Sequence, residues 1–113
     1  MFPKLELLVF LRIFAHMRII TRKTLKSFWE DFPDCEQSLL AWYKVAKKAK
    51  WSNFNEVKSQ FGSCKIVGTD RVIFKIKGNN YRLIVKITFV NQIIWIRFIG
   101  THTDYDKIDA KTI

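Results

Sequence analysis

The second half of the chain contains four short runs of β-branched and aromatic residues, and these runs constrain the fold most strongly. They read CKIVG, RVIFKIK, YRLIVKITF and IIWIRFIG and lie between residues 64 and 100. The last three are separated only by GNN at 78–80 and VNQ at 90–92. Connections this short suit hairpins, so we expect an antiparallel sheet.

Helical periodicity precedes the strands. After a short apolar strand at residues 17–20, Thr21 is expected to cap a helix that ends at Pro33. Asp34, with Gln37 three residues later, predicts a capping box and a second helix to about Ala49. Asn53 with Glu56 predicts a short third helix through residue 61. The apolar positions of the first helix recur at i, i+3, i+4 and i+7, namely Leu25, Phe28, Trp29 and Phe32.

Side-chain alternation assigns two different faces to the sheet. One face is apolar and must be covered by the helices, which predicts an α+β fold with helices packed on one face of the sheet. Its residues are Val72, Phe74, Ile76, Leu83, Val85, Ile87, Ile94, Ile96 and Phe98. The other face is expected to be open and basic, with Arg71, Lys75, Lys77, Arg82, Lys86 and Arg97 around Ile84 and Trp95.

Hairpin geometry brings these cations together. A turn centred on residues 78–79 places Lys75 opposite Arg82, and a turn centred on residues 91–92 places Lys86 opposite Arg97 and Arg82 opposite Thr101. Like charges directly opposite each other are destabilising. The arrangement therefore favours a phosphate-binding surface over a merely solvated surface, provided that the register is correct.

The net charge of +10 on 113 residues agrees with an anionic partner, namely a nucleic acid, an acidic protein or a membrane surface. The length predicts one domain. The two cysteines, Cys35 and Cys64, are too few for a disulfide framework and lack metal-ligand spacing. They favour a reduced, intracellular compartment, so we expect a cytoplasmic protein.

The first sixteen residues stand apart from this pattern. Residues 5–15 are mostly apolar but are interrupted by Glu6 and Arg12, and the run is too short to span a bilayer. For a signal peptide, the run has too few positive charges at its N-terminal end and no clear cleavage site. We therefore expect no membrane partner. Residues 1–16 are interpreted as an extension from a misplaced start, or as an accessory segment, and residues 17–113 as one domain.

The segment GTHTDYDKI at 100–108 follows the last strand and carries groups suited to chemistry. His102 is the side chain that moves protons near neutral pH, and Tyr105 can stack on a base or bind a phosphate. Beside a basic face, these groups could cleave RNA through the ribose 2′-hydroxyl, with arginines stabilising the phosphate charge. We expect no metal and no cofactor, because His16 and His102 are far apart and no carboxylate cluster is evident.

The motifs FW, AWY, F-x-I-K-G-N-x-Y-R-L and F-I-G-T-H-x-x-Y-D occur in this order between Met17 and about Ala110. In the order and spacing of these motifs the chain resembles the HigB toxins of bacterial type II toxin–antitoxin systems. The resemblance implies a RelE-like fold and a ribosome-dependent mRNA endonuclease neutralised by a helix-turn-helix antitoxin, HigA. The family's usual beginning corresponds to Met17. The candidates for catalysis are His102, Arg82, Tyr105 and Lys77, and those for RNA binding are Arg71, Lys75, Asn79, Lys86 and Arg97.

Two other classes of function remain open at this point. RelE-like relatives of the ParE kind inhibit DNA gyrase on a similar scaffold without cutting mRNA. A general RNA-binding module would bind naked RNA and cleave nothing. The KIKGNNYRL and GTHTDYD segments favour the endonuclease.

Overall fold

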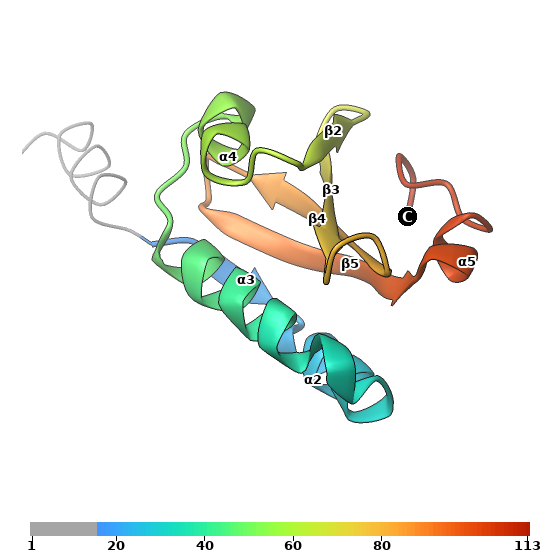
Figure 1. Ribbon diagram of the computed structural model, residues 1–113. Helices are drawn as coiled ribbons and strands as arrows, with labels where there is room; N and C mark the ends of the chain where they lie inside the picture. The colour runs from blue at the N-terminus through green and yellow to red at the C-terminus, as the bar shows by residue number, and fades with distance from the viewer. Residues whose placement is uncertain (1–15) are drawn as a thin grey trace, which may run out of the picture.

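Five strands form a single sheet in the computed structural model, which describes residues 16–113 (Figure 1). The strands follow one another across the sheet in the order β1-β5-β4-β3-β2. Their bounds are Arg18–Ile20 for β1, Lys65–Val67 for β2, Arg71–Ile76 for β3, Tyr81–Thr88 for β4 and Ile93–Thr101 for β5.

The four strands of the second half pair antiparallel, as expected, but β1 lies parallel to β5. The sheet is therefore mixed. A parallel pair requires a crossover connection. The helices that follow β1 in the sequence cross one face of the sheet and lead to the remaining strands.

The helices α2 (Arg22–Asp31) and α3 (Glu36–Lys48) run side by side along one face of the sheet, and α4 (Phe54–Gln60) lies near one end (Figure 1). A one-turn 3₁₀ helix, η1 (Pro33–Cys35), joins α2 to α3, and a short helix, α5 (His102–Tyr105), follows β5. The α+β prediction with helices on the apolar face is confirmed. The fully buried side chains of this core include Leu25, Leu39, Val57, Val72, Leu83, Val85 and Ile94.

The expected helix caps are confirmed for one helix of three. Asn53 accepts from the Glu56 N–H at 3.0 Å and caps α4. Thr21 stands at the N-cap of α2 in a left-handed conformation, and its side chain makes no capping bond. The Asp34–Gln37 capping box is wrong: α3 begins at Glu36, because the Asp34 carboxylate is engaged by Tyr81 and Lys77 across the fold.

Two features change the predicted register of β4 and β5. Thr88 pairs with Ile93, so the turn is centred on residues 90–91 and Lys86 lies opposite Trp95. A β-bulge then shifts the pairing between Ile84 and Val85, so that Arg82 lies opposite Gly100. The expected Lys86–Arg97 and Arg82–Thr101 pairs are therefore wrong, whereas Lys75 does lie opposite Arg82. A bulge inserts one unpaired residue and inverts the alternation beyond it.

The bulge also exchanges the faces of the sheet on which Phe98 and Ile99 lie. Phe98, predicted in the core, pairs with Ile84 on the second face, and Ile99 packs against the core in its place. The Phe98 ring lies over Gly100, where a Cβ atom would come within 2.5 Å of Phe98 Cζ. Glycine at this position therefore allows the ring to lie flat on the strand.

The second face is not as open as the sequence suggests. Ile73 and Ile84 on this face are buried, and so is Arg82, at 6% exposure. After α5 the chain turns back beside the sheet (Figure 1), and the backbone carbonyl of Ile113 reaches Arg71 and Arg97. The C-terminal segment is therefore bonded to two of the cations on this face.

Cys35 and Cys64 are both free and buried, as expected for core thiols. Burial raises the pKa of each thiol above its ordinary value. Within residues 16–113, no helix is long and apolar enough to cross a membrane. The interpretation of the N-terminal extension falls on residues 1–15, which lie outside the described part of the chain.

Candidate active site

Arg82 is held against the β3–β4 turn by three hydrogen bonds. Its Nη1 donates to the Asn79 carbonyl at 2.9 Å and to the Tyr81 carbonyl at 3.3 Å, and its Nη2 donates to Asn79 Oδ1 at 2.6 Å. The sequence predicts that Arg82 lies on an open face. That expectation is wrong, because the residue is buried and its guanidinium satisfies acceptors of the turn.

The short helix α5 is fixed at its first turn. The Thr101 hydroxyl accepts from the Asp104 N–H at 3.2 Å, and the His102 N–H donates to the Asn80 carbonyl at 3.2 Å. The second bond joins α5 directly to the turn that holds Arg82. Two segments twenty residues apart in the sequence therefore meet at one edge of the sheet.

Tyr105 bridges the arginine and the histidine. The Arg82 guanidinium carbon lies 5.6 Å from the centre of the Tyr105 ring, within cation–π range. The His102 and Tyr105 ring centres are 6.3 Å apart in an edge-on arrangement. The structure thus brings Arg82, Asn79, His102 and Tyr105 together, as the sequence predicts.

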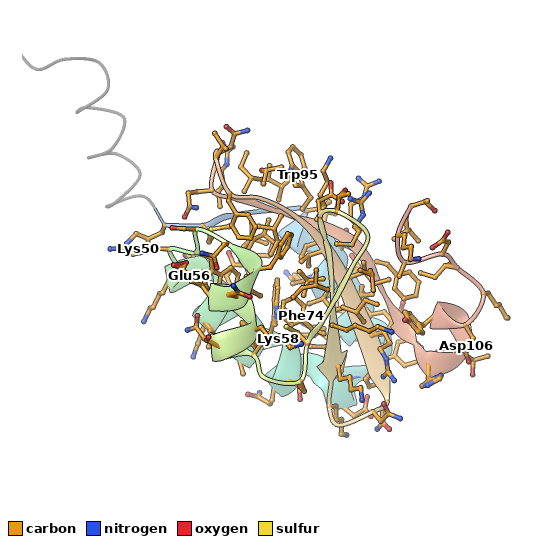
Figure 2. The ribbon with its side chains drawn as sticks, turned by 90° about the horizontal axis from the view of Figure 1, so that it is seen from above. Lys50, Glu56, Lys58, Phe74, Trp95 and Asp106 are labelled. Atoms are coloured by element: carbon orange, nitrogen blue, oxygen red, sulfur yellow. The ribbon has the colours of Figure 1, made fainter. Side chains whose placement is uncertain are left out.

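Asp106 is paired with the His102 imidazole. His102 Nδ1 and Asp106 Oδ2 are 3.2 Å apart, and the histidine side chain is about half exposed, at 47%. A carboxylate at this position favours the tautomer with the proton on Nδ1, which leaves the Nε2 lone pair available as a base. Asp106 marks the α5 end of the molecule in Figure 2, at the opposite end from Lys50 and Glu56 of the α4 region.

Arg82 and Lys75 form one cationic cluster, and a second one, made of Arg71, Lys86 and Arg97, lies further along the same face. Arg71 and Lys86 pair across β3 and β4, and both contact Asp70, with Nη1 of Arg71 at 2.5 Å and Nζ of Lys86 at 3.8 Å from its carboxylate oxygens. Arg71 Nε and Arg97 Nε donate to the Ile113 carbonyl at 3.0 and 3.2 Å. The predicted row of cations is therefore two clusters, and this one carries an acidic partner.

Lys77 belongs to neither cluster. Its backbone is left-handed, with a φ of 52°, so the strand alternation ends before it. Its Nζ pairs with Asp34 Oδ2 at 3.1 Å, and the Tyr81 hydroxyl donates to Asp34 Oδ1 at 2.6 Å. The expectation that Lys77 lies on the basic face is wrong, because the turn directs it toward η1. Lys75 remains exposed opposite Arg82.

The Asp34 contacts shift two pKa values in opposite directions. The Tyr81 hydroxyl and then Lys77 hold the pKa of Asp34 below its ordinary value of 3.8. The hydrogen bond to Asp34, and then burial, raise the pKa of Tyr81 to about 12. This pair ties the β3–β4 hairpin to the α2–α3 junction and has a structural role.

Sequence reasoning missed three contributors to these clusters. Asp106 stands four residues after His102, a spacing that predicts contact on one helical turn. Asp70 precedes a strand cation directly, which is a weaker signal. Nothing in the sequence pattern predicts the Ile113 carbonyl as an acceptor. No group of three or more His, Cys, Asp or Glu side chains within residues 16–113 is placed to hold a metal ion.

The protein is a mixed sheet with helices on one face and two cationic clusters on the other. A histidine and a tyrosine lie beside a buried arginine. Together these features define a small basic protein suited to binding an anion. Residues 35–108 match the family model described as HigB toxin, the RelE-like toxic component of a toxin–antitoxin system. The match spans more than half of the chain, which therefore belongs to this family of toxins.

Curated relatives agree with this membership. The chain is 27% identical over 94 residues to a protein named mRNA interferase HigB from Escherichia coli O6:H1 (strain CFT073), covering 81% of this chain and 91% of the relative. It is 29% identical over 96 residues to mRNA interferase toxin HigB of Escherichia coli K12 and to mRNA interferase HigB of Shigella flexneri. In both cases the alignment covers 83% of this chain and 92% of the relative.

Proposed function

We propose that this toxin is an mRNA interferase: a ribosome-dependent, metal-independent endoribonuclease that inhibits translation and is neutralised by a HigA-type antitoxin. The names of the relatives support the activity. The observation that carries the proposal is the meeting of Arg82, Tyr105 and His102 at one edge of the sheet.

His102 is the proposed general base. With Nδ1 held by Asp106, its Nε2 accepts the proton of a ribose 2′-hydroxyl, and the resulting oxygen attacks the adjacent phosphorus. The bond from phosphorus to the 5′ oxygen of the next nucleotide then breaks. The products are a 2′,3′-cyclic phosphate and a free 5′-hydroxyl.

Arg82 is the proposed stabiliser of the charge that builds on the phosphate. Nε and one N–H of Nη2 have no acceptor within the described residues, so the guanidinium retains donors for phosphate oxygens. Its other donors hold it rigidly on the turn. A fixed positive charge stabilises the transition state without reorganisation at the moment of reaction.

Tyr105 is the proposed donor to the leaving group. Its hydroxyl would give its proton to the departing 5′ oxygen and regain one from water. Its ring lies between the arginine and the histidine, so it is also placed to contact the RNA. Arg71, Lys75, Asn79, Lys86 and Arg97 are proposed to bind the flanking RNA, and Lys77 to act only through the turn that it stabilises.

The direct test is cleavage of a defined mRNA by the purified chain, with and without ribosomes programmed with that mRNA. The proposal expects cuts inside ribosome-bound codons and ends that carry a 2′,3′-cyclic phosphate, which attack by the 2′-hydroxyl leaves and direct hydrolysis by water does not. Inhibition of DNA gyrase with intact mRNA would instead support a ParE-like inhibitor. Binding to naked RNA without any cut would support a general RNA-binding module.

A further inference from the structure

A groove opens between the edge of β3 and helix α3, on the side of the sheet away from the candidate active site. Its volume is roughly 340 Å³. The walls come from α3, from the loop that follows α4 and from the end of β3. Figure 2 labels Phe74, which stands at the β3 wall of this groove.

The β3 wall is an unpaired strand edge. The register of β2 with β3 covers only Arg71–Ile73, so residues 74–76 have β4 on one side and no described strand on the other. No backbone hydrogen bond from these three residues to a loop or turn is present in the described part of the chain. An unpaired edge of this kind is a template for an added strand.

The α3 wall is small and apolar. Ala41 and Val45 stand one helical turn apart and face the groove, Ala41 exposed and Val45 half-buried. Phe61 and Phe74 contribute aromatic surface beneath them. A groove with a bare strand on one wall and small side chains on the other fits an extended segment with apolar side chains.

The charge of the groove selects the partner. Its lining includes the exposed cation Lys75 and no carboxylate, on a chain of net charge +10, and the other lysine of the lining, Lys77, is paired with Asp34. We propose that this groove binds a short extended segment of the toxin's own antitoxin, apolar at its centre and flanked by acidic residues, which adds a strand to β3 beside β2. Three extended residues span roughly 10 Å, enough to pair with residues 74–76.

The inference rests on membership of a toxin–antitoxin family and not on mRNA cleavage. A segment in this groove would leave His102 and Tyr105 uncovered, since these lie beyond the β3–β4 turn on α5. The antitoxin would then hold the toxin at a surface that shares only Lys75 with the residues proposed to bind RNA.

The test uses the antitoxin encoded beside this chain as the probe. Ala41→Glu places bulk and negative charge in the groove from an exposed position. It is expected to weaken antitoxin binding at least about tenfold, while leaving toxicity without antitoxin unchanged. Ala41→Arg has similar bulk and should weaken binding less, because its charge attracts the proposed acidic segment. Val90→Glu, at an exposed loop, is the matched control and should change the affinity less than about twofold.

Hydrogen exchange on the unmutated pair gives a second, independent readout. The backbone amides of residues 74–76 should exchange more slowly in the complex than in the free toxin. Equal affinity of Ala41→Glu and wild type, or unchanged exchange at these amides, would overturn the proposal. Both readouts measure binding, so they remain decisive even if the chain cuts no mRNA.

Discussion

Asp106 lies four residues after His102 and is paired with it, with Nδ1 of the ring 3.2 Å from Oδ2 of the carboxylate. His102 begins α5 and Asp106 caps its end, and the helix is itself bonded to the turn holding Arg82. If His102 is the general base, its replacement by Gln keeps a hydrogen-bonding side chain but removes the titrating group. We expect single-turnover cleavage on the ribosome to slow by about 10²–10⁴ with ribosome binding retained.

The pH profile separates catalysis from structure at this position. Across pH 5.5–8.5, wild-type cleavage should show a titration that His102→Gln lacks. Asp106→Asn should retain that titration and cut more slowly than wild type, because the ring is less well oriented. A loss below about fivefold with an unchanged profile would make His102 structural and assign the chemistry to Tyr105 and Arg82.

Arg82→Ala should reduce both activity and stability. The substitution removes the proposed phosphate donor and leaves two carbonyls and the Asn79 amide oxygen without their donor. We expect the free energy of unfolding to fall by about 2 kcal/mol and cleavage to fall well beyond what that loss explains. Denaturant titration measures the first, and cleavage by the folded fraction the second. Full activity with lowered stability would confine Arg82 to a structural role.

Lys86→Ala should reduce the salt dependence of RNA binding. Its side chain lies 3.8 Å from Asp70 on the face proposed to bind RNA, whereas Lys77 pairs with Asp34 on the other side. Removing one cation that neutralises a phosphate of single-stranded RNA lowers the slope of log affinity against log salt by about 0.7. Fluorescence anisotropy with a short single-stranded RNA should show this change of slope for Lys86→Ala and no change for the control Lys77→Ala. Equal slopes in the two variants would show that Lys86 does not touch the RNA.

Asp34→Asn should flatten the dependence of stability on pH at both extremes. The lowered pKa of Asp34 means that its contribution is complete above about pH 4 and is lost as the pH falls through that lowered value. The pKa of Tyr81, raised to about 12, means that its contribution is complete below pH 10 and is lost between pH 10 and 12.

Denaturant unfolding at pH 2–5 and 9–12 measures both effects. Asp31→Asn, at an exposed position at the end of α2, is the matched control and should leave the profile unchanged. Identical profiles for Asp34→Asn and wild type would show that the Asp34–Tyr81 bond contributes nothing to stability.

A chain that begins at Met17 should fold and be as toxic as the full chain. Met17 is buried, and its backbone nitrogen donates to the Ala49 carbonyl at 2.9 Å, a bond that a terminal amine can also make. Thermal unfolding should differ little between the two forms, and growth inhibition should match. Loss of folding or toxicity would assign residues 1–16 to the core or to an interface.

Local pattern determined much of this protein. The helical repeat of α2, the Asn53 cap of α4 and the β3–β4 hairpin all follow from interactions between residues close in the sequence. The same holds for the Lys75–Arg82 opposition, because a short turn sets the register beside it. Thr101, His102 and Tyr105 could likewise be placed together, since all three follow one strand directly.

Tertiary packing decided the rest. The bulge between Ile84 and Val85 moved Phe98 to the second face, and the left-handed backbone of Lys77 directed that side chain to Asp34. Arg82 became a buried anchor of the turn because the carbonyls of Asn79 and Tyr81 and the Asn79 side-chain oxygen accept its hydrogen bonds. Alternation predicts a face only while the pairing stays regular, and one inserted residue or one left-handed residue is enough to change it.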